Sequence, residues 1–175
     1  DCDHKWKIYF LRGKKKKYTV MTTKQLSEYL DTHIRNSPNI PKIENPKPLI
    51  LPNANLPIDP YVLGVWLGDG SKSCGMITQR KNSPIWTELK KRGYELGNNV
   101  IRNKERENTE SRTILGLSPT LKQLNLLNNK HIPEIYFRAS YEQRLDLLRG
   151  LMDTDGYYHP KRKRFCVKVG YKWQQ

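Results

Sequence analysis

Two short stretches of the chain end in an aspartate that is followed by glycine, and each carries another glycine five residues before that aspartate. In the first stretch Gly64 precedes Asp69, and in the second Gly150 precedes Asp155. The residues between are largely apolar, so each stretch is typical of a buried helix that stops at an acidic end. The repetition of this spacing predicts two helices that act together.

The glycines indicate how these helices would meet. Because glycine has no side chain, Gly64 and Gly150 would let the two backbones touch, and each helix would bring one aspartate to a shared end. Helix C-termini carry partial negative charge and free carbonyl groups. Together with Asp69 and Asp155 they would form an oxygen-lined site suited to Mg²⁺, which can activate water in phosphodiester hydrolysis.

A calcium-binding loop is the alternative for the second stretch, because Asp153, Asp155 and Gly156 resemble the start of one. Such a loop needs a glutamate at its twelfth position. Counted from Asp153, that position is Arg164, whose positive charge opposes calcium, so we reject this alternative. The counterpart of Asp153 in the first stretch is Leu67, which indicates a structural role for Asp153.

The charge of the chain favours a polyanionic partner. Its 175 residues include 32 Lys and Arg against 17 Asp and Glu, a formal net charge of +15. Nucleic acid is the usual partner of such a chain. No apolar run of about 18 residues and no signal peptide is present, so we expect no membrane partner. The three cysteines are far apart and form no Cys-x-x-Cys pair, which disfavours a zinc ribbon or a disulfide framework and indicates an intracellular protein.

The N-terminal third is expected to be rich in β-structure and then extended. Residues 5–10 and 18–21 are typical of strands, and the four lysines at 14–17 are expected to form a solvated hairpin turn after Gly13. Thr23 is predicted to cap a short helix. Residues 36–58 contain six of the 11 prolines and are predicted to be an extended connector.

Capping residues predict where the later helices begin. Helices are expected to start at the pairs Asp59-Pro60, Ser83-Pro84 and Ser118-Pro119, and at Ser140, which has a capping-box glutamine three residues on. The apolar faces would carry Ile85, Trp86, Leu89 and Leu96 in one helix and Leu145, Leu148, Leu151 and Met152 in the last.

Strands are expected at residues 74–80, 100–104 and 112–115, with a final hairpin after residue 156. Basic residues on or beside these strands would contact DNA phosphates. The candidates are Arg80, Lys81, Arg102, Arg112, Lys161 and Lys163.

On these residues the sequence resembles the LAGLIDADG homing endonucleases, and more narrowly those embedded in inteins. Residues 62–70 are similar to the family's first motif, 148–156 to its second, and 130–133 (Lys-His-Ile-Pro) to an element that inteins carry between them. The resemblance covers residues 56–160. It implies an α+β fold with an αββαββα repeat whose second copy is truncated, in a monomer with pseudo-twofold symmetry. It also implies site-specific cleavage of both strands of double-stranded DNA.

The resemblance implies roles for individual residues. Asp69 and Asp155 would be catalytic ligands of Mg²⁺, and the backbone carbonyls of Gly68 and Thr154 would be further metal ligands. Lys130 would lie beside the active site and polarise the attacking water. The matching lysine of the second half is not assigned, and its candidates are Lys168 and Lys172.

The opening residues resemble part of an intein splicing (Hint) domain, in which His4 would assist an acyl shift. Asp1 stands where a threonine is expected, so a plain histidine at a strand edge is the alternative. Splice-junction residues are missing at both ends, and we expect an internal fragment of an intein. Its parts would be a splicing-domain remnant (1–35), the connector (36–58), a first endonuclease half (59–139) and a truncated second half (140–175).

Two other functions are compatible with the sequence. A module of the same fold, similar to an intron maturase, would bind nucleic acid without cleaving it. A purely structural α/β domain would show no salt-sensitive DNA binding.

Overall fold

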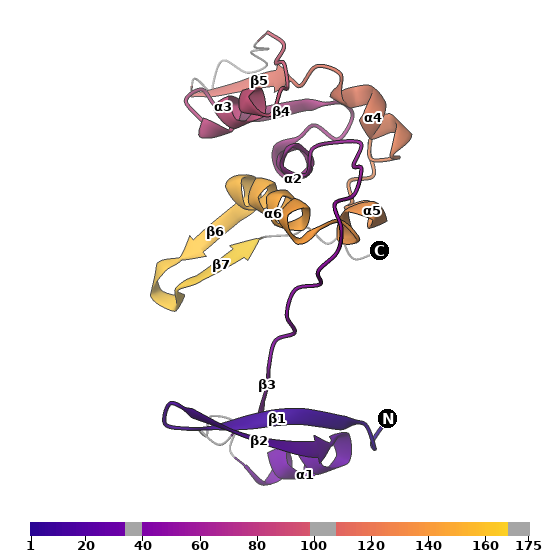
Figure 1. The fold of residues 1–175 in the computed structure, drawn as a ribbon. Helices are drawn as coiled ribbons and strands as arrows, with labels where there is room; N and C mark the ends of the chain where they lie inside the picture. The colour runs from indigo at the N-terminus through magenta and orange to yellow at the C-terminus, as the bar shows by residue number, and fades with distance from the viewer. Residues whose placement is uncertain (34–39, 99–107, 168–175) are drawn as a thin grey trace. The chain divides into compact units, whose positions relative to one another are not determined.

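The computed structural model describes residues 1–33, 40–98 and 108–167. The chain divides into two compact units, unit 1 (Asp1–Pro48) and unit 2 (Leu49–Gln175). Among the described residues it is a mixed α/β protein with three small antiparallel sheets and several helices (Figure 1). The strand predicted at 100–104 and the candidates Arg102, Lys168 and Lys172 lie outside the described residues. None of the described helices is long and apolar enough to cross a bilayer.

Unit 1 is a β-hairpin backed by a helix. Strand β1 (Lys5–Arg12) pairs with β2 (Lys15–Thr22), and the short β3 (Lys42–Ile43) pairs with the other edge of β1. Gly13 lies in the tight turn with φ of +60°, a backbone conformation that is strained for residues with a side chain. Helix α1 (Thr23–Thr32) follows, and Ile8 of β1 is buried.

Two predictions for unit 1 were wrong in detail. Three of the four lysines expected in the turn belong to β2, because they continue the antiparallel register up to Gly13. The N-cap of α1 is Thr22, not Thr23, because the hydroxyl of Thr22 accepts a hydrogen bond from the amide of Gln25. The side chain of Gln25 in turn accepts a hydrogen bond from the amide of Thr22, which completes a capping box.

Unit 2 contains the remaining elements. In chain order they are α2 (Pro60–Asp69), β4 (Met76–Arg80), α3 (Pro84–Lys91), β5 (Thr109–Thr113), α4 (Leu117–Gln123), α5 (Glu134–Phe137), α6 (Tyr141–Asp155), β6 (Gly156–His159), the 3-10 turn Pro160–Arg162, and β7 (Arg164–Val167). The predicted starts of α2 at Asp59-Pro60, α3 at Ser83-Pro84 and α6 at Ser140 are confirmed by capping hydrogen bonds.

Three predictions for unit 2 were wrong. Helix α4 begins after Gly116, which is left-handed (φ +75°), and Ser118 lies inside the helix with its hydroxyl bound to the amide of Gly75. Leu96 lies beyond α3 and forms an isolated bridge with Ile114. The helix–strand–strand–helix order that the resemblance implies after the first motif also differs, because β5 pairs with β4 across the intervening α3 and the described residues after α2 follow the order strand, helix, strand.

Helix α2 is the centre of unit 2. Residues Pro60 to Leu67 are all buried, which agrees with the prediction of a wholly apolar buried helix. Figure 1 shows α2 between the layer of β4, β5 and α3 and the helix α6. The surrounding core includes Ile77, Leu89, Leu117, Leu121 and Tyr136.

Helices α2 and α6 touch at their glycines. A Cβ built on Gly64 would lie 3.0 Å from the Cα of Gly150 and would collide with the carbonyl oxygen of Leu147. Backbone thus meets backbone at this crossing. The predicted apolar face of α6 needs correction, because its buried residues are Leu147 and Gly150, while Leu148 is 48% exposed.

We predict that Gly64→Ala lowers the free energy of unfolding by about 3 kcal/mol, near the upper end for an overpacked core, because the added methyl meets backbone that cannot rotate away. Chemical denaturation of the full chain measures this loss. Gly97→Ala is the matched control, since a Cβ there meets only ordinary contacts at 3.6 Å or more. Equal effects of the two changes would contradict the close helix contact.

Candidate functional site

Two carboxylates lie together where α2 and α6 end. Asp69 is the last residue of α2 and Asp155 the last of α6, and the following Gly70 and Gly156 cap the two helices. The Oδ2 atom of Asp155 lies 3.4 Å from the position that a Cβ on Gly68 would take. The two predicted aspartates are therefore brought to one place from positions 86 residues apart in the chain.

The environment of Asp69 disfavours its negative charge. Burial raises the pKa of Asp69, and the charge of Asp155 raises it further. The side-chain amide of Gln79 donates a hydrogen bond to Oδ2 of Asp69, which opposes this shift. Two crowded carboxylates of this kind gain most from a divalent cation between them.

Gln79 is a site residue that the sequence analysis missed. It lies on β4 two residues after the fully buried Ile77, so its side chain is on the inward face of the strand. The sequence signal for Gln79 was a polar residue at an inward position of a short strand. Its role became visible only through its hydrogen bond to Asp69, ten residues away in the sequence.

Lys130 lies against the C-terminal end of α2. Its Nζ donates hydrogen bonds to the carbonyl oxygens of Leu67 at 3.1 Å and Gly70 at 2.6 Å, and it sits 5.0 Å from the centre of the Trp66 ring. A cation here complements the partial negative charge of the helix end. Burial lowers the pKa of Lys130, whereas the charges of Asp155 and Asp69 raise it.

Gly68 and Thr154, the residues predicted to supply carbonyl ligands, face each other at this helix crossing. The carbonyl oxygen of Gly68 is 3.5 Å from Nζ of Lys130. A Cβ on Gly68 would collide with the hydroxyl of Thr154, so Gly68 is a second point of close approach between the helices. The Thr154 hydroxyl donates to the carbonyls of Gly150 and Leu151, both at 3.1 Å, and is therefore engaged within α6.

A groove of about 1040 Å³ opens beside Asp69. Its lining includes Asp69, Gln79, Arg80, Lys81, Asp153 and Thr154. Of the candidates for DNA binding, Arg80 and Lys81 thus line the same groove as Asp69. Both are exposed at the end of β4.

The remaining DNA-binding candidates lie elsewhere. Arg112 of β5 makes hydrogen bonds of 3.0 and 3.1 Å to the largely buried Glu110 and packs over the ring of Trp86. Its charge is therefore already paired within the protein. Lys161 and Lys163 are exposed in the connection between β6 and β7.

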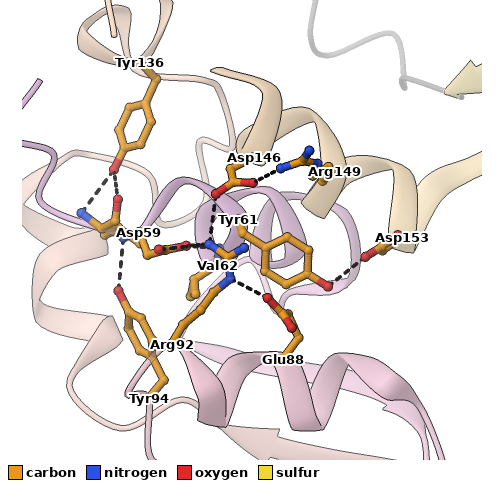
Figure 2. A network of polar contacts seen from close by, with 11 residues as sticks. Asp59, Tyr61, Val62, Glu88, Arg92, Tyr94, Tyr136, Asp146, Arg149 and Asp153 are labelled. Atoms are coloured by element: carbon orange, nitrogen blue, oxygen red, sulfur yellow. Dashed lines mark hydrogen bonds and ion pairs between the residues drawn. The ribbon is translucent and has the colours of Figure 1, made fainter. Parts of the chain in front are cut away.

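Asp153 contacts the first turn of α2 rather than its C-terminal end. Its Oδ2 accepts a hydrogen bond of 2.8 Å from the hydroxyl of Tyr61, which lies in the first turn of α2 (Figure 2). Burial raises the pKa of Tyr61, and the hydrogen bond to Asp153 raises it further, so the phenol remains the donor. Asp153 thus ties the last turn of α6 to α2.

Arg92 joins three carboxylates around the same helices (Figure 2). Its Nη1 lies 3.1 Å from both oxygens of Asp59, the N-cap of α2, and 3.2 Å from Oδ2 of Asp146 on α6. Its Nε lies 2.9 Å from Oε1 of Glu88, and its guanidinium stacks 4.5 Å from the ring centre of Tyr61. Arg92 therefore fixes α3, α6 and the start of α2 relative to one another.

His4 is exposed and packs edge-on against Trp6, with ring centres 4.5 Å apart. This contact does not test a role in protein splicing, which stays a prediction.

We predict that Arg92→Lys lowers the free energy of unfolding by about 2 kcal/mol, because an ammonium cannot reproduce the guanidinium hydrogen bonds to three carboxylates. Arg149→Lys is the control. Within the described ranges Arg149 forms an ion pair only with Asp146, and its side chain is 54% exposed against 20% for Arg92. The control should change stability by less than about 1 kcal/mol. Urea denaturation of both variants measures the difference, and a reversed order would contradict the bridging role.

We predict that Asp69→Asn raises the melting temperature of the metal-free protein by about 2 °C at neutral pH. Because the pKa of Asp69 is raised in the folded chain, the native state holds this proton more tightly than the unfolded state, and stability falls as pH rises through that pKa. The neutral amide of the Asp69→Asn variant does not ionise, so the variant does not lose this stability as pH rises.

The measurement is thermal unfolding in EDTA across a pH series. The difference between variant and wild type should shrink at acid pH, where Asp69 is protonated in both the folded and the unfolded chain. A variant that is less stable than wild type at neutral pH would show that Lys130 and Gln79 already stabilise the carboxylate.

Comparison with known proteins gives a relative named for an enzyme of DNA replication. No protein-family model matches the chain. Over 114 residues, 65% of this chain, it is 36% identical to a protein of Mycobacterium intracellulare named "Replicative DNA helicase DnaB". The matched part spans 17% of that relative's length.

These findings overturn the assignment of the chain to the LAGLIDADG homing endonucleases of inteins, because no family model matches and the relative is named a helicase. The physical reason is that the two motifs are short. Helix termination at Asp-Gly and a small residue at a helix crossing follow from packing and capping in many folds. What stands is a mixed α/β chain with two aspartates at adjoining helix ends.

Proposed function

We propose that the chain is a site-specific endonuclease that binds double-stranded DNA and hydrolyses phosphodiester bonds with Mg²⁺ at the ends of α2 and α6. The observation that carries the proposal is the pair Asp69 and Asp155, delivered to one place by two helices in backbone contact at Gly64 and Gly150. The charge of +15 supports a nucleic-acid substrate.

The donor set fits Mg²⁺. Asp69 and Asp155 offer hard carboxylate oxygens, and the backbone carbonyl of Gly68, 3.5 Å from Nζ of Lys130, would be a further oxygen ligand at the end of α2. Burial raises the pKa of Asp69 and the charge of Asp155 raises it further, and a divalent cation would oppose both effects. When bound, the ion would lower the pKa of a water molecule and stabilise the leaving oxygen.

The protein side chains would divide the remaining work. Gln79 holds Oδ2 of Asp69 and thereby orients that carboxylate. Lys130, which is half-buried at the end of α2, would present its charge to a scissile phosphate or to the attacking water. Arg80 and Lys81 line the groove next to Asp69 and would neutralise neighbouring phosphates.

The relative's name supports a DNA context. That protein is named a replicative DNA helicase, but the matched part is 17% of its length, so helicase activity is not carried over to this chain. A module that binds nucleic acid without cleaving it is the second candidate. The ion pair between Arg112 and Glu110 on β5 favours this second candidate, because Arg112 is then not available to contact a DNA phosphate as predicted.

We predict that Asp155→Asn lowers Mg²⁺-dependent cleavage about 1000-fold, because losing one ligand removes several kcal/mol of transition-state stabilisation. The assay incubates the full chain with a library of random duplexes, and the cut ends are captured and sequenced. Asp153→Asn is the matched control, since its amide oxygen can still accept the Tyr61 hydrogen bond. It should cut at close to the wild-type rate.

Binding of Mn²⁺, followed by electron paramagnetic resonance, gives a second readout. Asp69→Asn and Asp155→Asn should each weaken Mn²⁺ binding, whereas Asp153→Asn should not. If Asp155→Asn cut DNA as fast as wild type, the proposed role of the pair would be wrong. If wild type bound DNA and never cut it, the non-cleaving module would be the correct function.

A further inference from the structure

The tip of the β1–β2 hairpin in unit 1 carries a dense group of cations that the candidate site does not use. Around the turn at Gly13 lie Arg12, Lys14, Lys15, Lys16 and Lys17, and all are exposed. Unit 1 as a whole holds 11 Lys and Arg against five Asp and Glu in its sequence. Its positive charge is therefore concentrated at one end of the hairpin.

The register of the hairpin sets like charges against each other. Arg12 pairs directly with Lys15, and Phe10 pairs with Lys17, so Arg12, Lys15 and Lys17 share one face of the ribbon. Like charges at directly opposed positions destabilise a strand pair. Fold stability therefore gives no reason for this arrangement, whereas binding of an anion would offset the repulsion.

The two faces of the tip differ in their counter-charges. Lys16, on the opposite face, makes an ion pair of 2.7 Å with Glu44. Within the described part of the chain, no carboxylate forms an ion pair with Arg12, Lys14, Lys15 or Lys17.

A hollow opens on the face that lacks counter-charges. It has a volume of about 400 Å³ and is lined by Phe10, Arg12, Lys17, Thr19 and Tyr29, with no acidic side chain among them. Two cations and a hydroxyl thus converge on a space large enough for a phosphate and its sugar. The rings of Phe10 and Tyr29, which contact each other with centres 5.5 Å apart, would border the sugar.

We propose that the hairpin tip is a second DNA-binding site, at which Arg12, Lys15 and Lys17 contact the phosphates of duplex DNA and the hollow receives one phosphate. A two-stranded ribbon is one of the two elements that the major groove admits. An anionic membrane fits less well, because elements that bind at the bilayer interface insert large apolar side chains. Residues 12–17 contain none.

This site needs neither a metal ion nor the aspartate pair, so it goes beyond the proposed function and can be tested separately. The triple variant K14Q/K15Q/K17Q of the full chain removes three tip charges. The control K5Q/K24Q/K47Q removes three exposed charges from the same unit away from the tip. Because both variants lose the same net charge, any difference between them reports local contacts.

The measurement is binding to a random-sequence 30-base-pair duplex in EDTA over a series of salt concentrations. In the tip variant, the slope of log K against log salt should fall by about 2, as expected for the loss of the two phosphate contacts of Lys15 and Lys17, and affinity should drop about tenfold or more. The control variant should change the slope by less than about 1. Melting temperatures of both variants verify folding, and the tip variant should be at least as stable as wild type.

Equal losses in the two variants would overturn the proposal, because net charge alone would then explain binding. It would also be overturned if the tip variant lost binding to phosphatidylserine vesicles while its affinity for duplex DNA was unchanged. The proposed function can fail independently. If Asp155→Asn still cut DNA while the tip variant lost affinity, the hairpin site would stand and the catalytic pair would not.

Discussion

The backbone contact between α2 and α6 is the constraint on which the candidate site depends. Gly64 and Gly150 remove the side chains that would hold the helices apart, and Gly68 makes room for Thr154 one turn further along. Because the helices run side by side to the same end, their last residues, Asp69 and Asp155, meet. A larger residue at any of the three glycines would separate the carboxylates as well as loosen the core.

Gathering negative charge at one helix crossing has an energetic cost, which Lys130 partly offsets, while a second cation, Arg92, acts on other carboxylates of the same helices. Lys130 binds the carbonyl end of α2 beside the aspartates. Arg92 binds Asp59, Glu88 and Asp146, so it secures the opposite end of α2 and the middle of α6. Arginine suits this second position because its planar fork can reach several carboxylates at once. The Tyr61–Asp153 hydrogen bond completes the link between the helices.

The positive charge of the chain is arranged in two ways that correspond to two tasks. Around the core of unit 2, arginines such as Arg92 and Arg112 form ion pairs with carboxylates of the same unit and stack on aromatic rings. At the groove and at the hairpin tip of unit 1, cations lie exposed on strand ends. Net charge alone does not distinguish these groups, because the distinction depends on which carboxylates the fold brings near.

The local features of the fold could be predicted from the sequence. Capping residues predicted the starts of α2, α3 and α6, the run of apolar residues predicted a buried α2, and the repeated glycine spacing predicted which helices would meet. Caps and the apolar run depend on neighbours within a few residues, whereas the contact of Gly64 with Gly150 was predicted because the same spacing occurs twice. The contacts of Gln79 with Asp69 and of Arg92 with three elements were established by the fold and not by the sequence. They join strands and helices whose separation in the chain carries no periodic signal, and hydrogen-bond geometry in three dimensions selects them. Glu110 and Arg112 lie two residues apart on β5, so they share one face of that strand, and the structure shows that they pair.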